Sequence, residues 1–267
     1  MISRPLIHFA HANGIPSLVY KKLFELFADE YDVVYVSTLG TDPSYPTDKN
    51  WSNFADQIIN NIEQQAQGRK VIGVGHSLGA VSTLLASFKR PDLFEQVILL
   101  DPPLIMGKAS FAFDVAKRFF PNQLDKMTPA KLSLRRRDHW DSREQAYELL
   151  RPKSLYQKFD EYCFQAYIDY ALVEDVERGG VTLTIPKAAE VAIFRSGPSS
   201  WWLPHKKTQV PVHMVAGSES PFLQQKFPQM AEKKLGIPFT VIEGGHMFPL
   251  EYPDETVKVV KSLIIKI

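Results

Sequence analysis

The chain has 267 residues, of which 45% are hydrophobic and 23% are charged, as is ordinary for a globular protein with a large core. A formal net charge of +1 excludes a broad basic surface for nucleic acid, and the lone cysteine, Cys163, excludes an intrachain disulfide. The N-terminus has no apolar run of signal-peptide length. No segment of the sequence approaches the roughly 20 consecutive apolar residues that a membrane span needs. We therefore expect a cytoplasmic protein without stable membrane association.

The first hundred residues alternate between short apolar runs and longer stretches with apolar residues at helical spacing. Short runs bounded by turn residues indicate strands, and the longer period indicates amphipathic helices. Strands that alternate with helices favour a mostly parallel central sheet with helices on both faces, an α/β fold. The expected strands are 5–10, 31–37, 70–74 and 96–100, and the expected helices are 17–29, 51–67 and 77–89.

A helical, charged and aromatic-rich segment, residues 103–209, interrupts this alternation. The alternation then resumes, with expected strands at 210–216 and 239–243 and expected helices at 222–235 and 254–267. We therefore predict an α/β core formed by residues 1–102 and 210–267, into which residues 103–209 are inserted as a helical cap.

A serine between two glycines stands where the expected strand 70–74 runs directly into the expected helix 77–89, in Gly75-His76-Ser77-Leu78-Gly79. Such a turn forces its central residue into a strained conformation, and the glycines avoid collisions with the neighbouring strand and helix. The turn presents a hydroxyl at a helix N-terminus, where free N–H groups favour developing negative charge. Ser77 is therefore a candidate nucleophile.

A serine nucleophile needs a base to take its proton, and the base works best when a carboxylate orients it. Among the seven histidines, His246 follows a strand and two glycines, on a loop that can bring its imidazole to the sheet edge. His76 adjoins Ser77, but adjacent residues at such a turn point apart. His8 and His213 lie within strand patterns, where core or sheet-face positions are expected.

The turn around Ser77, the inserted segment and the late Gly-Gly-His together resemble the α/β-hydrolase fold family with a helical cap, over essentially the whole chain. The resemblance implies that Ser77 is the nucleophile and His246 the general base. It also implies an oxyanion hole formed by the backbone N–H groups of Leu78 and Ile15, the latter in Asn13-Gly14-Ile15-Pro16. Asn13 stands where the family often has a histidine, which changes loop packing more than it changes the donor.

The orienting acid departs from the family pattern. Family members most often carry an aspartate after the strand that follows the cap, and Ser220 occupies that position here. Asp101, at the end of the strand 96–100, is the preferred acid because it would stand one strand away from Ser77. Glu219, one residue from the usual site, is the alternative, and a site with no acid is a third. Asp101 could also simply end its strand and start a turn.

A serine nucleophile indicates acyl transfer and argues against the dehalogenase and epoxide hydrolase chemistry of relatives with an aspartate nucleophile. We expect hydrolysis of carboxylic esters or thioesters through an acyl-enzyme, with a small apolar acyl substrate and without a metal or cofactor. Carbon–carbon bond hydrolysis, lyase chemistry and non-catalytic ligand binding stay open. We interpret Arg135-Arg136-Arg137 as a solvated helix end, with contact to an anionic substrate as the alternative. The expected pocket residues are Asn13, His76, Phe111, Trp201 and Trp202.

Overall fold

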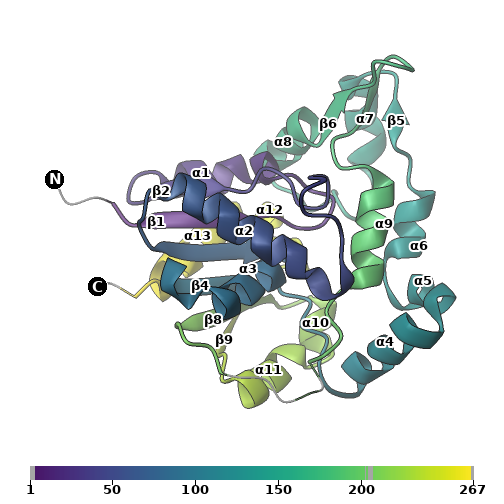
Figure 1. Ribbon diagram of the computed structural model, residues 1–267. Coiled ribbons are helices and arrows are strands. Elements are labelled where there is room, and N and C mark those ends of the chain that lie inside the picture. The colour runs from purple at the N-terminus through teal and green to yellow at the C-terminus, as the bar shows by residue number, and fades with distance from the viewer. Residues whose placement is uncertain (1–3, 202, 204–206, 266–267) are drawn as a thin grey trace.

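The computed structural model describes residues 4–201, 203 and 207–265, and its central element is a six-stranded sheet. The strands are β1 (Leu6–Ala10), β2 (Asp32–Tyr35), β3 (Val71–His76), β4 (Phe94–Leu100), β8 (Val212–Gly217) and β9 (Phe239–Ile242). They lie in the order β2-β1-β3-β4-β8-β9, and each neighbouring pair is parallel. The carboxyl ends of all six strands therefore meet at one edge of the sheet, which Figure 1 shows facing the teal and green helices.

Helices cover both faces of this sheet because its central strands are apolar on both sides. One face carries α2 (Ser52–Gln65), α3 (Leu78–Lys89) and α11 (Phe227–Leu235), and the other carries α1 (Lys21–Phe27) and α13 (Pro253–Leu263). In β4, Val97 and Leu99 pack with the first group, whereas Ile98 and Leu100 pack with the second. In the described ranges, no helix is both long enough and apolar enough to cross a lipid bilayer.

The predicted fold class is confirmed, but two predicted helices are wrong in their extent. The stretch 222–235 is divided into α10 (Pro221–Gln224) and α11, because Lys226 adopts a left-handed φ of 61° and Pro228 has no N–H to continue a helix. The helix expected at 254–267 is α13, which ends at Leu263, and a separate short helix, α12 (Phe248–Glu251), precedes it. The loop that carries His246 therefore lies between β9 and α12.

Residues 103–209 are called the inserted segment below, and their helices and strands lie in Figure 1 beyond the carboxyl ends of β1, β3 and β4. The segment also contains a three-stranded antiparallel sheet in the order β5-β7-β6, so the expectation of a purely helical insertion is incomplete. Strands of two or three residues are too short for an alternation pattern to reveal.

The boundaries of a cap domain stay a prediction. The elements are α4 (Gly107–Phe119), α5 (Leu124–Met127), α6 (Ala130–Arg135), β5 (His139–Trp140), α7 (Arg143–Leu150), α8 (Glu161–Tyr170), β6 (Leu172–Glu174), β7 (Val181–Leu183) and α9 (Lys187–Ser196).

His8 in β1 and His11 just after it are completely buried, which predicts a pH-dependent stability. Burial lowers the pKa of each to about 4, against a smaller opposing effect of their hydrogen bonds. Below the unfolded-state pKa of about 6.5, the unfolded chain binds protons that the folded chain does not. The free energy of unfolding is expected to fall by about 2 kcal/mol per histidine between pH 7 and pH 5. Unfolding by guanidinium chloride at pH 7 and at pH 5 measures this difference in the free energy of unfolding.

The matched control for this prediction is His139→Gln, since His139 is only partly buried, in β5. This variant should keep the same pH dependence as the wild type. Equal unfolding free energies of the wild type at pH 7 and pH 5 would contradict the prediction.

Candidate active site

Ser77 lies at a sharp bend between β3 and α3. Its φ of 53° and ψ of −114° fall in a region that residues other than glycine rarely occupy. A Cβ on Gly75 would lie 2.5 Å from the backbone of Gly79, and a Cβ on Gly79 would collide with the carbonyl of Ala10. The N–H of Ser77 donates to the carbonyl of Leu100 at 2.9 Å. The bend therefore holds the Ser77 hydroxyl at the carboxyl edge of the sheet.

His246 reaches this hydroxyl from the loop between β9 and α12. The loop passes through Gly244 with a φ of 118°, which glycine adopts far more readily than other residues. The ring Nε2 of His246 lies 3.0 Å from Ser77 Oγ, and its Nδ1 lies 2.6 Å from Asp101 Oδ2. Because an ionised carboxylate can only accept, we assign the ring proton to Nδ1, which leaves Nε2 as an acceptor for the Ser77 proton.

Asp101 follows the last residue of β4 and is 1% exposed, with a left-handed φ of 41°. Its Oδ1 accepts the N–H of Gly217 at 3.1 Å, and its Oδ2 accepts the hydroxyl of Ser220 at 2.6 Å as well as the His246 ring proton. Three donors compensate for the desolvation of this carboxylate. Ser220 stands where the family usually has its acid, and here it donates to a carboxylate that comes from the neighbouring strand.

Glu219, the alternative acid, pairs with a lysine at the surface and makes no hydrogen bond to the His246 imidazole. Its side chain is 59% exposed, and its Oε2 pairs with Lys158 Nζ at 2.5 Å. Of the two carboxylates considered from the sequence, the structure brings Asp101 to His246.

His76 lies beneath the His246 loop and does not line a pocket as predicted. It is completely buried, and burial holds its pKa well below the usual range, so the ring is neutral. Its Nε2 donates to the backbone carbonyl of His246 at 2.8 Å, and its Nδ1 accepts from the Tyr20 hydroxyl at 2.7 Å. His76 and Tyr20 therefore support the backbone of the histidine loop. Nothing in the sequence singled out Tyr20, because a helical apolar pattern also explains a tyrosine at that position.

The backbone N–H groups of Leu78, which follows Ser77, and of Asn13, in the loop after β1, have no acceptor among the described residues. The N–H of Ile15 donates to the carbonyl of Ala12 at 3.1 Å, in a turn that Gly14 closes with a φ of 74°. The geometry therefore does not support the expectation of Ile15 as an oxyanion donor, since the turn already uses its N–H.

The other predicted pocket residues lie in different surroundings. Phe111 on α4 is 51% exposed, and Trp201 is 1% exposed in the cluster that α2, α3 and α11 share. Trp202 lies outside the described residues. The Asn13 side chain donates to the carbonyl of Glu190 at 3.0 Å, so Asn13 alone of these residues joins the loop after β1 to the inserted segment.

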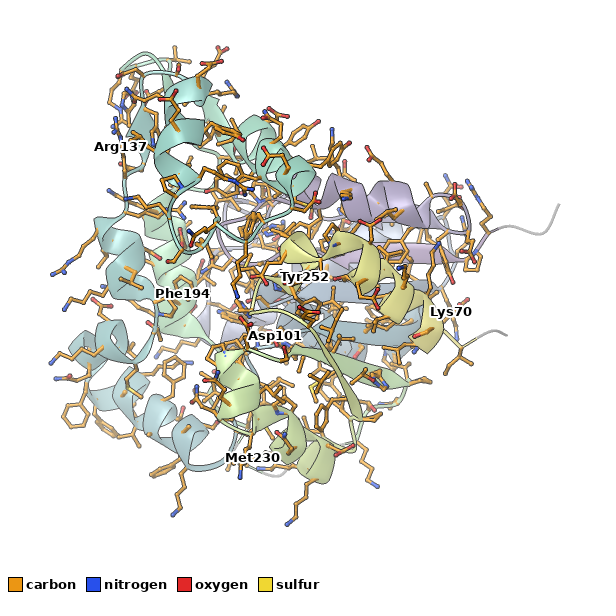
Figure 2. All side chains as sticks on the ribbon, turned by 180° about the vertical axis from the view of Figure 1, so that it is seen from behind. Lys70, Asp101, Arg137, Phe194, Met230 and Tyr252 are labelled. Atoms are coloured by element: carbon orange, nitrogen blue, oxygen red, sulfur yellow. The ribbon has the colours of Figure 1, made fainter. Side chains whose placement is uncertain are left out.

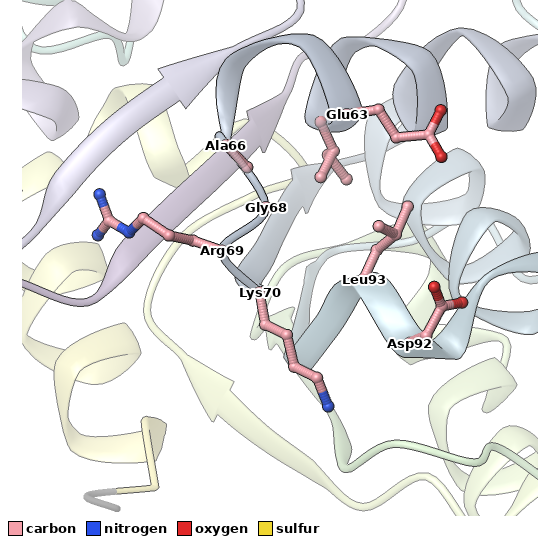
Figure 3. Close-up of a pocket in the computed structure, with 8 residues that line it drawn as sticks. Glu63, Ala66, Gly68, Arg69, Lys70, Asp92 and Leu93 are labelled. Carbon is pink, nitrogen blue, oxygen red and sulfur yellow. The ribbon is translucent and has the colours of Figure 1, made fainter.

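A surface hollow of about 140 Å³ lies where α2 ends and β3 begins (Figure 3). Ser77 follows the opposite end of β3, so this hollow is separate from the candidate site. Figure 2 shows the same separation, with Asp101 at the centre of the molecule and Lys70 at the side away from the inserted segment. The lining residues are Ile62, Glu63, Ala66, Gly68, Arg69, Lys70, Asp92 and Leu93.

A parallel sheet with a serine on a sharp strand–helix turn and a histidine on a late loop defines a class of hydrolase folds. The family model described as "Alpha/beta hydrolase family" matches residues 9–259, and the chain belongs to this family.

Individual relatives are more distant. A probable esterase of Oryza sativa subsp. japonica is 35% identical over 104 residues, 36% of this chain and 38% of that protein. Type I acyl-CoA thioesterase mpaH of Penicillium brevicompactum is 24% identical over 169 residues, 57% of this chain and 36% of that protein. The chain thus matches little more than a third of each. The crystal structure of E-2-(acetamidomethylene)succinate hydrolase superposes with a TM-score of 0.73 at 20% identity, over 97% of this chain and 91% of that chain.

Proposed function

We propose that this protein is a serine hydrolase that cleaves carboxylic esters or thioesters through an acyl-enzyme on Ser77. The observation that carries the proposal is the continuous set of contacts from Ser77 Oγ to His246 Nε2, at 3.0 Å, and from His246 Nδ1 to Asp101, at 2.6 Å. A nucleophile, a base and an orienting carboxylate within hydrogen-bond reach are what activation of a serine requires.

In the proposed acylation step, Ser77 Oγ attacks the substrate carbonyl carbon while His246 Nε2 takes the hydroxyl proton. The imidazolium is stabilised by Asp101, which also holds the ring in the required orientation. Collapse of the tetrahedral intermediate breaks the bond to the leaving group, and His246 returns the proton to the departing oxygen or sulfur. Water, deprotonated by His246, then hydrolyses the acyl-enzyme and restores the Ser77 hydroxyl.

The negative oxygen of each tetrahedral intermediate needs donors that are already in place. We assign this role to the backbone N–H groups of Leu78 and Asn13, since neither has an acceptor among the described residues. Leu78 is the first residue of α3, where the helix dipole adds to the stabilisation. Asn13 replaces Ile15 in this assignment because the N–H of Ile15 is already bonded within its turn.

Two relatives named as an esterase and as an acyl-CoA thioesterase support the proposed substrate class. The test is incubation with a fluorophosphonate probe, followed by mass spectrometry of the adduct and by turnover of a panel of neutral esters and thioesters. A phosphonyl adduct on Ser77 together with turnover supports the proposal. An unlabelled Ser77 would instead favour a ligand-binding protein with a hydrolase fold.

Glu219→Gln is expected to leave kcat/KM for these esters within about twofold of the wild type, because its carboxylate pairs with Lys158 at the surface. The same panel of esters measures it, and Lys158→Gln is the matched control because it removes the other half of the pair. A hundredfold loss in Glu219→Gln alone would move the orienting acid from Asp101 to Glu219.

A further inference from the structure

Arg136 differs from the two arginines beside it. Arg135 and Arg137 are exposed, whereas Arg136 turns inward just after α6 and its side chain is only 21% exposed. Its Nη1 lies 3.1 Å from Oε2 of Glu190, a residue of α9 whose side chain is 8% exposed. Burial of such charges costs free energy unless their donors and acceptors are satisfied. The interpretation of this run as a solvated helix end therefore fails for its middle residue.

The contact with Glu190 leaves one edge of the Arg136 guanidinium unused. Nε and Nη2 are shielded from solvent and make no hydrogen bond of ordinary geometry to the described residues, although the Tyr167 hydroxyl lies beside the group. These two N–H groups lie on the same side of the planar group and match the two oxygens of a carboxylate. Burial acts to lower the pKa of Arg136, but Tyr167 and Glu190 outweigh this effect and raise it, so the group stays charged. A buried charged fork without an acceptor indicates a binding group for a ligand.

This fork lies close to the loop that carries the proposed oxyanion donor. A Cβ on Gly14 would be 3.1 Å from the Glu190 carboxylate, so the partner of Arg136 packs directly on that loop. The side chain of Asn13 donates to the backbone carbonyl of Glu190 at 3.0 Å, and its own Oδ1 is buried without a hydrogen-bond partner. Unpartnered polar atoms therefore gather where the inserted segment meets this loop.

The walls beside the fork are aromatic and apolar. Tyr156 and Tyr167 are both buried, and the Tyr156 hydroxyl donates to that of Tyr167 at 2.9 Å. They belong to one hydrophobic cluster with Ala12 and Ile15, which flank the proposed oxyanion donor. An apolar wall beside a guanidinium that keeps one edge free of its partner Glu190 suits an acyl compound that carries a second, anionic group.

We propose that Arg136 binds a carboxylate group of the substrate through the Nε–Nη2 edge of its guanidinium. This inference rests on the proposed function and narrows its substrate class to carboxylate-bearing esters or thioesters. A purely structural pair needs only the Nη1 contact and the hydrogen bond from Ser133 Oγ to Glu190 at 2.8 Å, and it leaves this edge without a role.

The test compares 4-nitrophenyl hydrogen adipate with 4-nitrophenyl hexanoate, two esters that differ only in the terminal carboxylate. The wild type should prefer the adipate ester, and Arg136→Gln should lower the ratio of the two kcat/KM values at least about tenfold. Arg136→Gln also leaves Glu190 unpaired and could unfold, so the double variant Arg136→Gln/Glu190→Gln is measured beside it. Arg135→Gln, an exposed neighbour, is the matched control and should keep the wild-type ratio. 4-Butanoyloxybenzoate, with its carboxylate on the leaving group, distinguishes which side of the ester Arg136 contacts.

A binding measurement separates this inference from the proposed function. Titration calorimetry with adipate should give an affinity at least about tenfold weaker for the folded double variant than for the wild type and for Arg135→Gln. Equal adipate affinities in the wild type and the double variant would overturn the role of Arg136. Unchanged relative kcat/KM values for both the adipate ester and 4-butanoyloxybenzoate, each measured against 4-nitrophenyl hexanoate, would overturn it too. If the wild type and the double variant both turn over the two esters, and every such comparison is unchanged between them, the role of Arg136 is overturned and the serine hydrolase proposal stays intact. Adipate binding without turnover of either ester would support Arg136 and count against the hydrolase.

Discussion

Ser77→Ala is expected to lower kcat for neutral esters about 10⁶-fold, because it removes the atom that forms the acyl-enzyme. What remains should be the small acceleration that the oxyanion donors and substrate binding supply alone, about 10³-fold over water. The fluorophosphonate adduct should disappear at the same time. Steady-state kinetics with 4-nitrophenyl hexanoate and intact-mass spectrometry measure the two effects independently.

The matched control is Ser154→Ala, because Ser154 is an exposed serine of the inserted segment. It should retain wild-type turnover and wild-type labelling. If Ser77→Ala kept more than a tenth of the wild-type kcat in a preparation free of contaminating esterase, the nucleophile would have to be another residue. The strained backbone of Ser77 would then have no catalytic explanation.

Local chemistry made the candidate nucleophile and the candidate base recognisable in the sequence. The glycines beside Ser77 are required by contacts within a few residues and with one adjacent strand, and such a requirement leaves a visible motif. His246 could be found because two glycines and a strand precede it. The alternation of strands and helices predicted the parallel sheet for the same reason, since each apolar run records the burial of its own strand.

What the sequence could not provide depends on contacts between distant segments. Ser220 was recognised as a departure from the family pattern, but its bond to Asp101 joins residues 119 positions apart. The sequence predicted the N–H of Ile15 as an oxyanion donor, but this N–H is bonded to the carbonyl of Ala12 within its turn. A motif match does not reveal which N–H groups such a turn uses. Arg136 turns inward toward Glu190, which lies 54 positions later in the chain. The sequence alone therefore offered no reason to distinguish Arg136 from Arg135 and Arg137.

Asp101→Asn is the second variant with a large expected effect, a fall in kcat of about 10⁴-fold, or about 5 kcal/mol in activation free energy. Asparagine fits the same space and its amide oxygen can still accept from Gly217. Its amide N–H₂ would face His246 Nδ1 and favour the tautomer in which Nε2 carries the proton. That tautomer cannot accept a proton from Ser77. Steady-state kinetics and the rate of fluorophosphonate labelling should fall together.

The position of Ser220 offers a way to return the lost activity. The hydroxyl of Ser220 and Nδ1 of His246 both lie 2.6 Å from the same oxygen of Asp101, so a carboxylate at position 220 comes within reach of the imidazole. Asp101→Asn/Ser220→Asp is therefore expected to recover about 10- to 100-fold of the lost kcat, whereas the control Asp101→Asn/Ser220→Ala should recover none. Recovery in both double variants would show that loss of the Ser220 hydroxyl is enough and that a carboxylate at position 220 is not needed. Recovery only with aspartate would mean that the His246 imidazole requires a carboxylate as its partner. That carboxylate could then follow either of two adjacent strands, β4 or β8. The acid of this fold can then move between β4 and β8 while the nucleophile and the base keep their places.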